Sequence, residues 1–199
     1  MSEYKFTKDW FSNAVQIWEQ IFAQLPEKKM LLEVGSYEGR SSCWLVENAL
    51  EDGGVLYCLD TWEGGEEHKA AGDNMGSVRE RFESNITEIR KQFPLRSVMS
   101  VAGESYVSLA SFIASGSSGK FDFIYIDGSH QAADVLADAC MAFGLLKIGG
   151  VMVFDDYLWS PQIDLIRRPK AAIDAFVNLF CERLLVISTG YQLAIQRVR

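Results

Sequence analysis

The chain has 199 residues, of which 48% are hydrophobic and 23% charged, a composition typical of a globular domain rather than a disordered or fibrous protein. Its formal net charge of −8 at pH 7 makes it a poor partner for nucleic-acid phosphates or an anionic membrane, since both are bound through lysine and arginine. We therefore expect a small-molecule partner, no nucleic acid and no membrane.

Hydrophobic periodicity predicts helices and strands that alternate along the chain. The first helix is predicted from Thr7, as its N-cap, to Leu25. The later helices are predicted at Ser41–Glu51, Val78–Phe93, Ser105–Ala114, Ala132–Leu146 and Pro169–Glu182. The strands are predicted at Met30–Val34, Val55–Asp60, Ser97–Val101, Phe121–Asp127 and Val151–Asp155, followed by a hairpin of Leu184–Ser188 and Tyr191–Val198.

Strands such as Phe121–Asp127 are continuously apolar, as expected of parallel strands covered by helices on both faces. Right-handed crossovers between them give a doubly wound, Rossmann-like α/β sheet to which the final hairpin adds antiparallel strands. We expect residues 1–199 to form one domain, with residues 1–28 as an N-terminal helix packed on its core.

The start of the chain, Met-Ser-Glu-Tyr-Lys-Phe, lacks the apolar segment of a signal peptide, and no apolar run approaches the ~20 residues of a membrane span. The four cysteines are widely spaced and form no Cys-x-x-Cys pair. These features predict a cytoplasmic protein with buried, reduced thiols.

Ligands of such sheets bind beyond the carboxyl ends of the strands. The first strand ends in a loop with glycines at 35 and 39, which differs from the dinucleotide fingerprint, and Glu38 would repel a pyrophosphate. Asp60 follows Gly39 by about 20 residues, an offset at which a carboxylate accepts hydrogen bonds from ribose hydroxyls. The turn 103–105, after the third strand, lies on the same edge. These features favour a nucleoside ligand without phosphates.

Three carboxylates follow the fourth and fifth strands, namely Asp127, Asp155 and Asp156. Such close like charges repel, so they predict a site for Mg²⁺, Mn²⁺ or Ca²⁺, the alternative being a solvated acidic rim. His130 lies beside them, where a neutral imidazole accepts a substrate proton, the alternative being a structural histidine. His68 is expected at the surface.

Four segments together resemble the class I S-adenosylmethionine-dependent methyltransferases. They are Leu32-Glu-Val-Gly-Ser-Tyr-Glu-Gly-Arg-Ser-Ser, Leu59-Asp-Thr-Trp-Glu-Gly, Ile126-Asp-Gly-Ser-His and Gly149-Gly-Val-Met-Val-Phe-Asp-Asp-Tyr. The resemblance runs from about residue 30 to 199 and is strongest to the branch that includes the macrolide-sugar O-methyltransferases, with catechol O-methyltransferase more distant. It implies a seven-stranded sheet of order 3-2-1-4-5-7-6.

The resemblance also implies a cofactor and a set of site residues. S-adenosylmethionine would be bound by Glu33, Gly35, Ser36, Gly39, Asp60, Thr61, Trp62, Gly103, Ser105 and Asp127. Mg²⁺, or Mn²⁺ or Ca²⁺, would be held by Asp127, Asp155 and Asp156, and His130 would be the base that acts beside Asp127. Catechol O-methyltransferase has asparagine in place of Asp156, which favours the sugar-methylating branch.

The expected reaction is metal-assisted methylation of a hydroxyl on a small molecule, such as a sugar or a phenol. A metal-independent methyltransferase, a nicotinamide-dependent oxidoreductase and a non-catalytic cofactor-binding protein stay open as alternatives, and so does homo-oligomer formation. The segments Thr61–Ser77 and Tyr157–Arg168 are long enough to form a lid.

Overall fold

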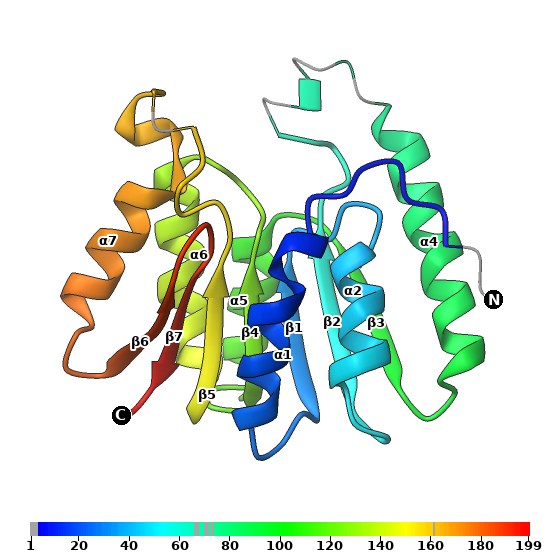
Figure 1. The fold of residues 1–199 in the computed structure, drawn as a ribbon, viewed down its shortest axis with the longest axis horizontal. Helices are drawn as coiled ribbons and strands as arrows, with labels where there is room; N and C mark the ends of the chain where they lie inside the picture. The colour runs from blue at the N-terminus through cyan, green and yellow to red at the C-terminus, as the bar shows by residue number, and fades with distance from the viewer. Residues whose placement is uncertain (1–3, 66–67, 70–71, 73, 161) are drawn as a thin grey trace.

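Seven strands form one mixed sheet in the order β3-β2-β1-β4-β5-β7-β6 (Figure 1). The computed structural model describes residues 4–65, 68–69, 72, 74–160 and 162–199. The parallel strands are β1 (Met30–Val34), β2 (Val55–Asp60), β3 (Ser97–Ala102), β4 (Phe121–Ile126) and β5 (Leu146–Phe154). A hairpin of β6 (Leu184–Thr189) and β7 (Leu193–Arg197) pairs antiparallel with β5. The predicted fold class and strand order are therefore confirmed.

Helices cover both faces of the sheet (Figure 1). One face packs against α1 (Val15–Gln24), α2 (Arg40–Trp44) with its continuation η2 (Leu45–Ala49), and α4 (Met75–Gln92). The other face packs against α5 (Ser105–Ala114), α6 (Ala132–Leu145) and α7 (Pro169–Leu179). The short helices η1 (Ser12–Ala14) and η3 (Leu165–Arg167) precede α1 and α7.

Each face of the sheet carries its own hydrophobic core. Trp18 of α1 is completely buried and its ring contacts Phe123 and Tyr125 on β4. On the opposite face, Phe143 of α6 packs against Phe176 of α7. Each such large apolar side chain contributes roughly 1.5–3 kcal/mol when buried, so the two cores fix the strands and the loops that leave them.

The N-terminal helix starts later than its sequence pattern predicts. Residues 4–11 form no helix, and the first helical turn is η1. Thr7 caps no helix; its amide and hydroxyl both donate to Glu38, at 2.6 Å each. A tertiary partner on the loop after β1 thus replaces the expected helix cap, and the segment runs across the carboxyl edge of the sheet (Figure 1).

Two further expectations are corrected. Strand β5 begins at Leu146, directly after α6, so Gly149 and Gly150 lie within the strand rather than between helix and strand. All four cysteines are free, but only Cys43 and Cys58 are buried, whereas Cys140 and Cys181 are exposed.

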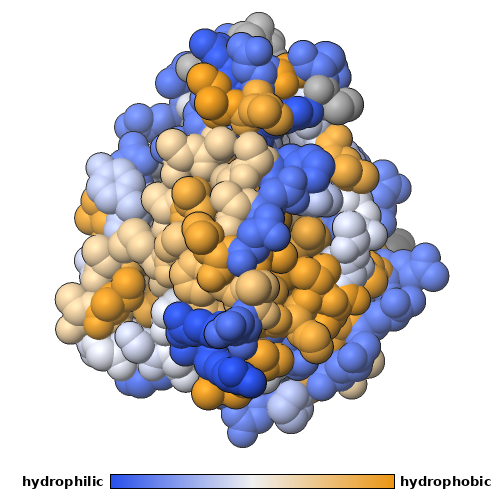
Figure 2. All heavy atoms as spheres, turned by 90° about the vertical axis from the view of Figure 1, so that its left-hand side faces the viewer, coloured by the Kyte–Doolittle hydropathy of each residue, from blue (hydrophilic) through white to orange (hydrophobic). Residues whose placement is uncertain are grey.

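The β6 edge of the sheet carries exposed hydrophobic side chains. Figure 2 views the molecule from this side, where apolar surface predominates. Leu185, Val186 and Ile187 of β6 are between 43% and 49% exposed, and Leu179 at the end of α7 is 78% exposed. Within the described ranges, no helix is long and apolar enough to cross a membrane.

Candidate active site

A cavity of about 1270 Å³ lies at the carboxyl edge of the parallel strands. Its walls come from the loops after β1, β2, β3, β4 and β5, from the N-terminal segment and from the turn between β6 and β7. The topology explains this position, because parallel strands bring all of their carboxyl ends to one edge. The predicted site residues that line it are Gly35, Ser36, Asp60, Thr61, Gly103, Ser105, Asp127, His130, Asp155 and Asp156.

The loop after β1 approaches β4 so closely that only glycine fits at position 35. Gly35 has φ +84°, and a Cβ there would lie 1.9 Å from the carbonyl oxygen of Asp127. The Gly35 amide donates to the carbonyl of Leu59, at 2.8 Å. The loop is therefore anchored to two neighbouring strands, with its backbone facing the cavity.

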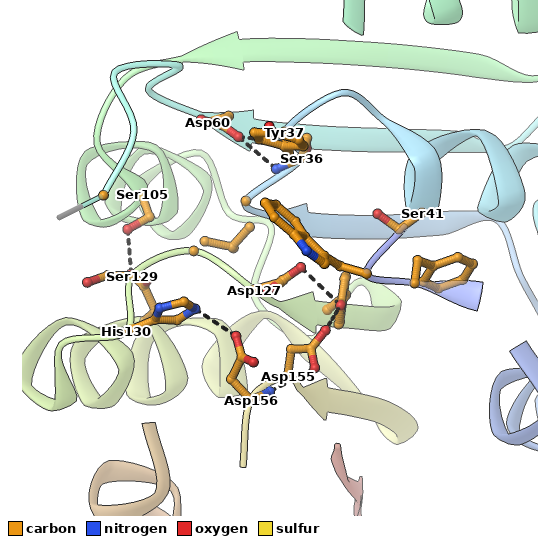
Figure 3. Close-up of a pocket in the computed structure, with 18 of the residues that line it drawn as sticks. Ser36, Tyr37, Ser41, Asp60, Ser105, Asp127, Ser129, His130, Asp155 and Asp156 are labelled. Atoms are coloured by element: carbon orange, nitrogen blue, oxygen red, sulfur yellow. Dashed lines mark hydrogen bonds and ion pairs between the residues drawn. The ribbon is translucent and has the colours of Figure 1, made fainter. Parts of the chain in front are cut away.

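Asp60 organises this loop through its carboxylate. Oδ2 accepts the amides of Ser36 and Tyr37, at 2.8 and 2.9 Å, and Oδ1 accepts the amide of Trp62, at 2.7 Å. Figure 3 shows Asp60 beside Ser36 and Tyr37 at the cavity. Because a carboxylate has about four acceptor positions, Asp60 keeps one for a ligand hydroxyl.

Two acidic residues of the first motif are occupied by the protein itself. Glu33 is fully buried and accepts hydrogen bonds from Ser36, Ser41 and Ser42. Burial raises the pKa of Glu33, although these hydroxyls oppose the shift. Glu38, only 2% exposed, accepts from Thr7 and from Arg81 Nε at 2.6 Å. Burial acts to raise the pKa of Glu38, but the bonds from Thr7 and Arg81 outweigh it and lower the pKa.

Three predicted cofactor residues lie behind the cavity wall rather than on it. Glu33 sits under the loop, as described. Gly39 has φ +79° and a Cβ there would approach the ring of Phe82 at 3.0 Å. Trp62 is 6% exposed, packs on the same ring and donates from Nε1 to the carbonyl of Tyr37. Their contacts in the structure support the loops that form the wall.

Asp127 and Asp155 approach each other across the hydroxyl of Tyr125 (Figure 3). The Tyr125 hydroxyl is 3.0 Å from Asp127 Oδ2 and also contacts Asp155 Oδ2. Burial, followed by the charges of the neighbouring aspartates, raises the pKa of Asp127 well above its ordinary value. Burial and Asp156 raise that of Asp155. The pair therefore lies in a region of strongly negative potential.

Asp156 turns toward His130. Its φ of +57° is in the left-handed region, which is uncommon outside glycine, asparagine and aspartate. Asp156 Oδ2 lies 2.7 Å from His130 Nε2, and Oδ1 accepts from the hydroxyl of Tyr191, at 2.8 Å. The His130 ring also packs against that of Trp159, with centroids 4.3 Å apart and the ring planes tilted by 34°. The structure thus brings the predicted base and all three predicted metal ligands to one end of the cavity.

These carboxylates do not form a ready-made metal centre. Within the described ranges, no group of three or more His, Cys, Asp or Glu side chains is arranged to hold a metal ion. Hydroxyl, imidazole and amide donors contact their oxygens instead, among them Gln192 Nε2 at 3.1 Å from Asp155 Oδ2. The chemistry of the donor set fits a hard divalent cation, because carboxylate oxygens are its preferred ligands.

The part of the cavity wall between α5 and α6 also carries carboxylates. Ser105, at the start of α5, donates to Asp138 Oδ1 of α6 at 2.6 Å. Asp138 is 3% exposed, and burial raises its pKa to about 6. Glu104 and Asp134 also line the cavity, and their charges act on Asp138. Gly103 connects this part of the wall to β2, because its amide donates to the carbonyl of Asp60 at 3.0 Å.

Aromatic side chains lie at the mouth of the cavity. Trp10 is 61% exposed, and its ring centroid is 4.9 Å from that of Tyr37. His68, expected at the surface, is half-buried against both rings and lines the cavity. Of the two segments predicted to form a lid, residues 66–67, 70–71, 73 and 161 lie outside the described residues.

Several site residues were missed in the sequence because they belong to no motif. Tyr125 reads as an apolar strand residue, Asp138 as an ordinary helix carboxylate, and Gln192 as part of a hairpin. Gln192 accepts from Trp18 Nε1 at 2.7 Å, which links the N-terminal helix to the acidic end. Only the strand order, which places the β6–β7 turn beside β5, indicates that turn as a contributor.

Residues 32–157 match the sequence profile of a family described as methyltransferase domain. A 45-residue stretch is 42% identical to the uncharacterized protein R132 of Acanthamoeba polyphaga mimivirus; it covers 21% of this chain and only 20% of that protein.

Solved structures share the fold. An O-methyltransferase from Bacillus cereus, in complex with S-adenosylhomocysteine, is 20% identical with a TM-score of 0.68, over 96% of this chain and 84% of that one. MycE of the mycinamycin pathway, in complex with Mg and S-adenosylhomocysteine, is 16% identical with a TM-score of 0.61, over 96% of this chain and 51% of that one. An rRNA methylase from Streptococcus thermophilus is 9% identical with a TM-score of 0.62, over 98% and 100% of the two chains.

The profile covers more than half of the chain and runs from within β1, through the glycine loop, to just past the acidic pair after β5. The chain therefore belongs to the methyltransferase domain family, which confirms the resemblance to class I S-adenosylmethionine-dependent methyltransferases and the prediction of an enzyme of that class.

Proposed function

We propose that the protein transfers the methyl group of S-adenosylmethionine to a hydroxyl oxygen of a small molecule, with His130 as the base and a divalent cation at the acidic end. One observation carries this proposal. His130 and the aspartates at 127, 155 and 156 converge in the same cavity as the glycine loop after β1. A proton acceptor, a set of hard ligands and a cofactor loop thus surround one space.

The cofactor would lie along the carboxyl edge. Asp60 has an acceptor position left for a ribose hydroxyl, and the backbone around Gly35 is open to the methionine part. From Asp60, the adenine ring of the cofactor would reach Gly103 and Ser105, since the Gly103 amide is hydrogen-bonded to the Asp60 carbonyl. The sulfonium would then approach Asp127, and a cation suits that strongly negative position.

The carboxylates at 127, 155 and 156 would hold the metal. Burial of mutually repelling carboxylates favours uptake of either a proton or a cation. When bound, a divalent cation supplies Lewis-acid chemistry, lowering the pKa of a hydroxyl that it touches. Cation binding would require Asp127 and Asp155 to exchange their present contacts with Tyr125, and Asp156 Oδ1 to exchange its contact with Tyr191, while Asp156 Oδ2 keeps His130.

His130 would accept the proton. The acceptor oxygen forms a bond to the methyl carbon while the methyl–sulfur bond breaks, and the hydroxyl proton passes to the imidazole, leaving a neutral thioether. Asp156 orients the ring and stabilises the imidazolium. The cavity walls align the reactants, and alignment alone is worth ~7–11 kcal/mol in favourable systems.

The acceptor would be a small ring-bearing molecule. Trp159 covers His130, and Trp10 and Tyr37 lie at the mouth, so a sugar or phenol ring has aromatic surfaces to pack against. The net charge of −8 disfavours an RNA acceptor, whose phosphates need lysine and arginine.

The test measures binding, transfer and metal dependence in turn. Calorimetry with S-adenosylhomocysteine reports cofactor binding, and mass spectrometry reports methyl transfer to a panel of sugars and catechols with Mg²⁺ or with EDTA. We expect micromolar binding, product with Mg²⁺, and loss with EDTA that Mg²⁺ restores. Asp155→Asn should abolish the Mg²⁺ stimulation, whereas Asp52→Asn, on an exposed turn, should keep it.

Each alternative gives a different result. Product that is unchanged by EDTA would identify a metal-independent methyltransferase. Cofactor binding without transfer to any acceptor would favour a non-catalytic binding protein, and tight NADH binding without S-adenosylhomocysteine binding would favour an oxidoreductase. Methylated ribosomal RNA together with inert small molecules would contradict the acceptor class.

A further inference from the structure

Asp138 is a buried carboxylate that the proposed chemistry leaves unused. It lies on α6, far along the chain from the glycine loop, yet it lines the cavity. Its side chain is 3% exposed. Burying a carboxylate costs folding free energy unless hydrogen-bond donors or positive charges compensate it. Among the described residues, its one side-chain hydrogen-bond partner is the hydroxyl of Ser105, which donates to Oδ1 at 2.6 Å.

The second carboxylate oxygen of Asp138, Oδ2, is available to a ligand. Within the described part of the chain, Oδ2 receives no hydrogen bond. It is also not one of the fully buried polar atoms without a partner, so it keeps some exposed surface. Since Asp138 lines the cavity, Oδ2 is the oxygen that a ligand can reach. An ionised carboxylate oxygen only accepts, so the group that it binds must be a donor.

The neighbours of Asp138 strengthen this preference for a donor. The hydroxyl of Ser105 donates its only proton to Asp138, so toward the cavity this hydroxyl can only accept a hydrogen bond. Glu104 and Asp134 also line the cavity, and the loop after β3 and the wall from α6 contribute no lysine or arginine among the described lining residues. A ligand keto oxygen placed here would face other acceptors and form no hydrogen bond, whereas a ligand amino group would donate a hydrogen bond to Asp138.

This acceptor-rich part of the wall coincides with the place where the proposed function puts the base of the cofactor. Gly103 is bonded to Asp60, the expected ribose ligand, and Ser105 follows two residues later. A base attached to a ribose at Asp60 therefore extends toward Ser105 and Asp138. The Watson–Crick edge of adenine carries one exocyclic amino group, at the 6-position, and hypoxanthine has a keto oxygen there.

We propose that Asp138, buttressed by Ser105, is the residue that selects adenine by accepting a hydrogen bond from its 6-amino group. The inference rests on the proposed cofactor position and adds a specificity-determining residue to it. A good polar pair discriminates between bases by roughly 1–3 kcal/mol. That range corresponds to about a 5- to 150-fold preference for the adenine form of the cofactor over the hypoxanthine form.

The experiment compares S-adenosylhomocysteine with S-inosylhomocysteine by calorimetry, on wild type and on Asp138→Asn. Wild type should prefer the adenosyl compound by at least ~5-fold. An asparagine amide can donate to the keto oxygen, so the variant should bind the adenosyl compound more weakly and the inosyl compound more tightly, bringing the ratio to within about threefold. Asp52→Asn, the same change on an exposed turn outside the cavity, should keep the wild-type ratio.

Other outcomes overturn the inference in distinguishable ways. If Asp138→Asn weakens both compounds by the same factor, Asp138 is structural and the specificity role is wrong, while the proposed function stands. If wild type binds neither compound, the proposed cofactor site itself fails. If the variant does not fold, wild type is tested with the N6,N6-dimethyl analogue of S-adenosylhomocysteine instead. This analogue has no N–H at the 6-position and should bind as weakly as the inosyl compound. Full affinity of wild type for it would contradict the proposal.

Discussion

The carboxylates at the end of β1 and those after β4 and β5 share one edge of the sheet but have opposite environments. Glu38 receives two hydrogen bonds from Thr7 and an ion pair from Arg81, which together lower its pKa despite burial. Asp127 and Asp155 share the hydroxyl of Tyr125, and burial beside one another raises the pKa of both. The first environment is complete without a ligand. In the second, no lysine or arginine among the described residues forms an ion pair with Asp127 or Asp155.

This difference separates structural acids from candidate functional ones. A carboxylate whose donors all come from the protein stabilises the loop that carries it, as Glu38 does for the loop after β1. A carboxylate whose neighbours are other carboxylates gains most from a cation or a proton. Both kinds look alike in the sequence, where each is an acidic residue shortly after a strand.

The largest expected effect is on turnover at the acidic end. Asp127→Asn should lower kcat about 10⁴-fold, corresponding to about 5 kcal/mol, because under the proposed function it removes a metal ligand and a charge that faces the sulfonium. The dissociation constant for S-adenosylhomocysteine should change by less than about threefold, because the nucleoside is held elsewhere. Asp52→Asn serves as the control, and a variant at position 127 that keeps a tenth of the activity would remove Asp127 from the mechanism.

The next effect is on stability at the β1 end. Glu38→Ala should lower the free energy of unfolding by about 4 kcal/mol, because Arg81 and the Thr7 amide lose their buried partner. Urea denaturation measures this. Glu83→Ala removes an exposed partner of Arg79 on the same helix as Arg81 and should cost under about 0.5 kcal/mol. Equal losses in the two variants would mean that Glu38 is not the anchor of the loop.

Sequence reasoning reached the fold because the signals were local and strong. Continuous apolar runs such as Phe121–Ile126 predicted parallel strands, and the acids after β4 and β5 were correctly placed on one edge. The order of the strands came from the family resemblance rather than from any pattern within the chain.

Sequence reasoning failed where a distant partner decides. Thr7 is predicted to cap a helix, but in the structure it bonds to Glu38 instead. The sequence also gives no sign that Trp62 packs against Phe82. Asp138 gave no signal at all, since its partner Ser105 lies 33 residues earlier and only the packing of α5 against α6 joins them. Pairings of this kind depend on tertiary structure, which no local spacing encodes.

Asp138 should also give stability a distinctive pH dependence. Burial raises its pKa from 3.8 to about 6, so between these values the folded state holds a proton that the unfolded state has lost. Stability therefore falls as pH rises from about 4 to 6, by at most about 3 kcal/mol, and stays level above that.

Urea denaturation of Asp138→Asn and wild type across pH 4 to 7 isolates this contribution from that of the other acids. The stability of the variant relative to wild type should rise over the interval from pH 4 to 6, because asparagine carries no charge to bury. Asp52→Asn, on an exposed turn outside the cavity, is the matched control and should show no such rise. A relative stability of Asp138→Asn that does not change with pH would contradict the assigned burial of the charge.

The smallest expected effect distinguishes a side chain that stabilises the cavity wall from one that contacts the cofactor. Trp62→Phe keeps an aromatic ring against Phe82 but removes the Nε1 donor to the Tyr37 carbonyl, so unfolding should become easier by about 1 kcal/mol. Trp10→Phe, at a 61% exposed position, should change stability by less than about 0.5 kcal/mol. Calorimetry with S-adenosylhomocysteine should give Trp62→Phe a wild-type affinity, since the indole faces the core. A tenfold weaker affinity with unchanged stability would instead make Trp62 a direct cofactor ligand, and the loop after β2 would then have to turn its buried side to the cavity when the cofactor binds.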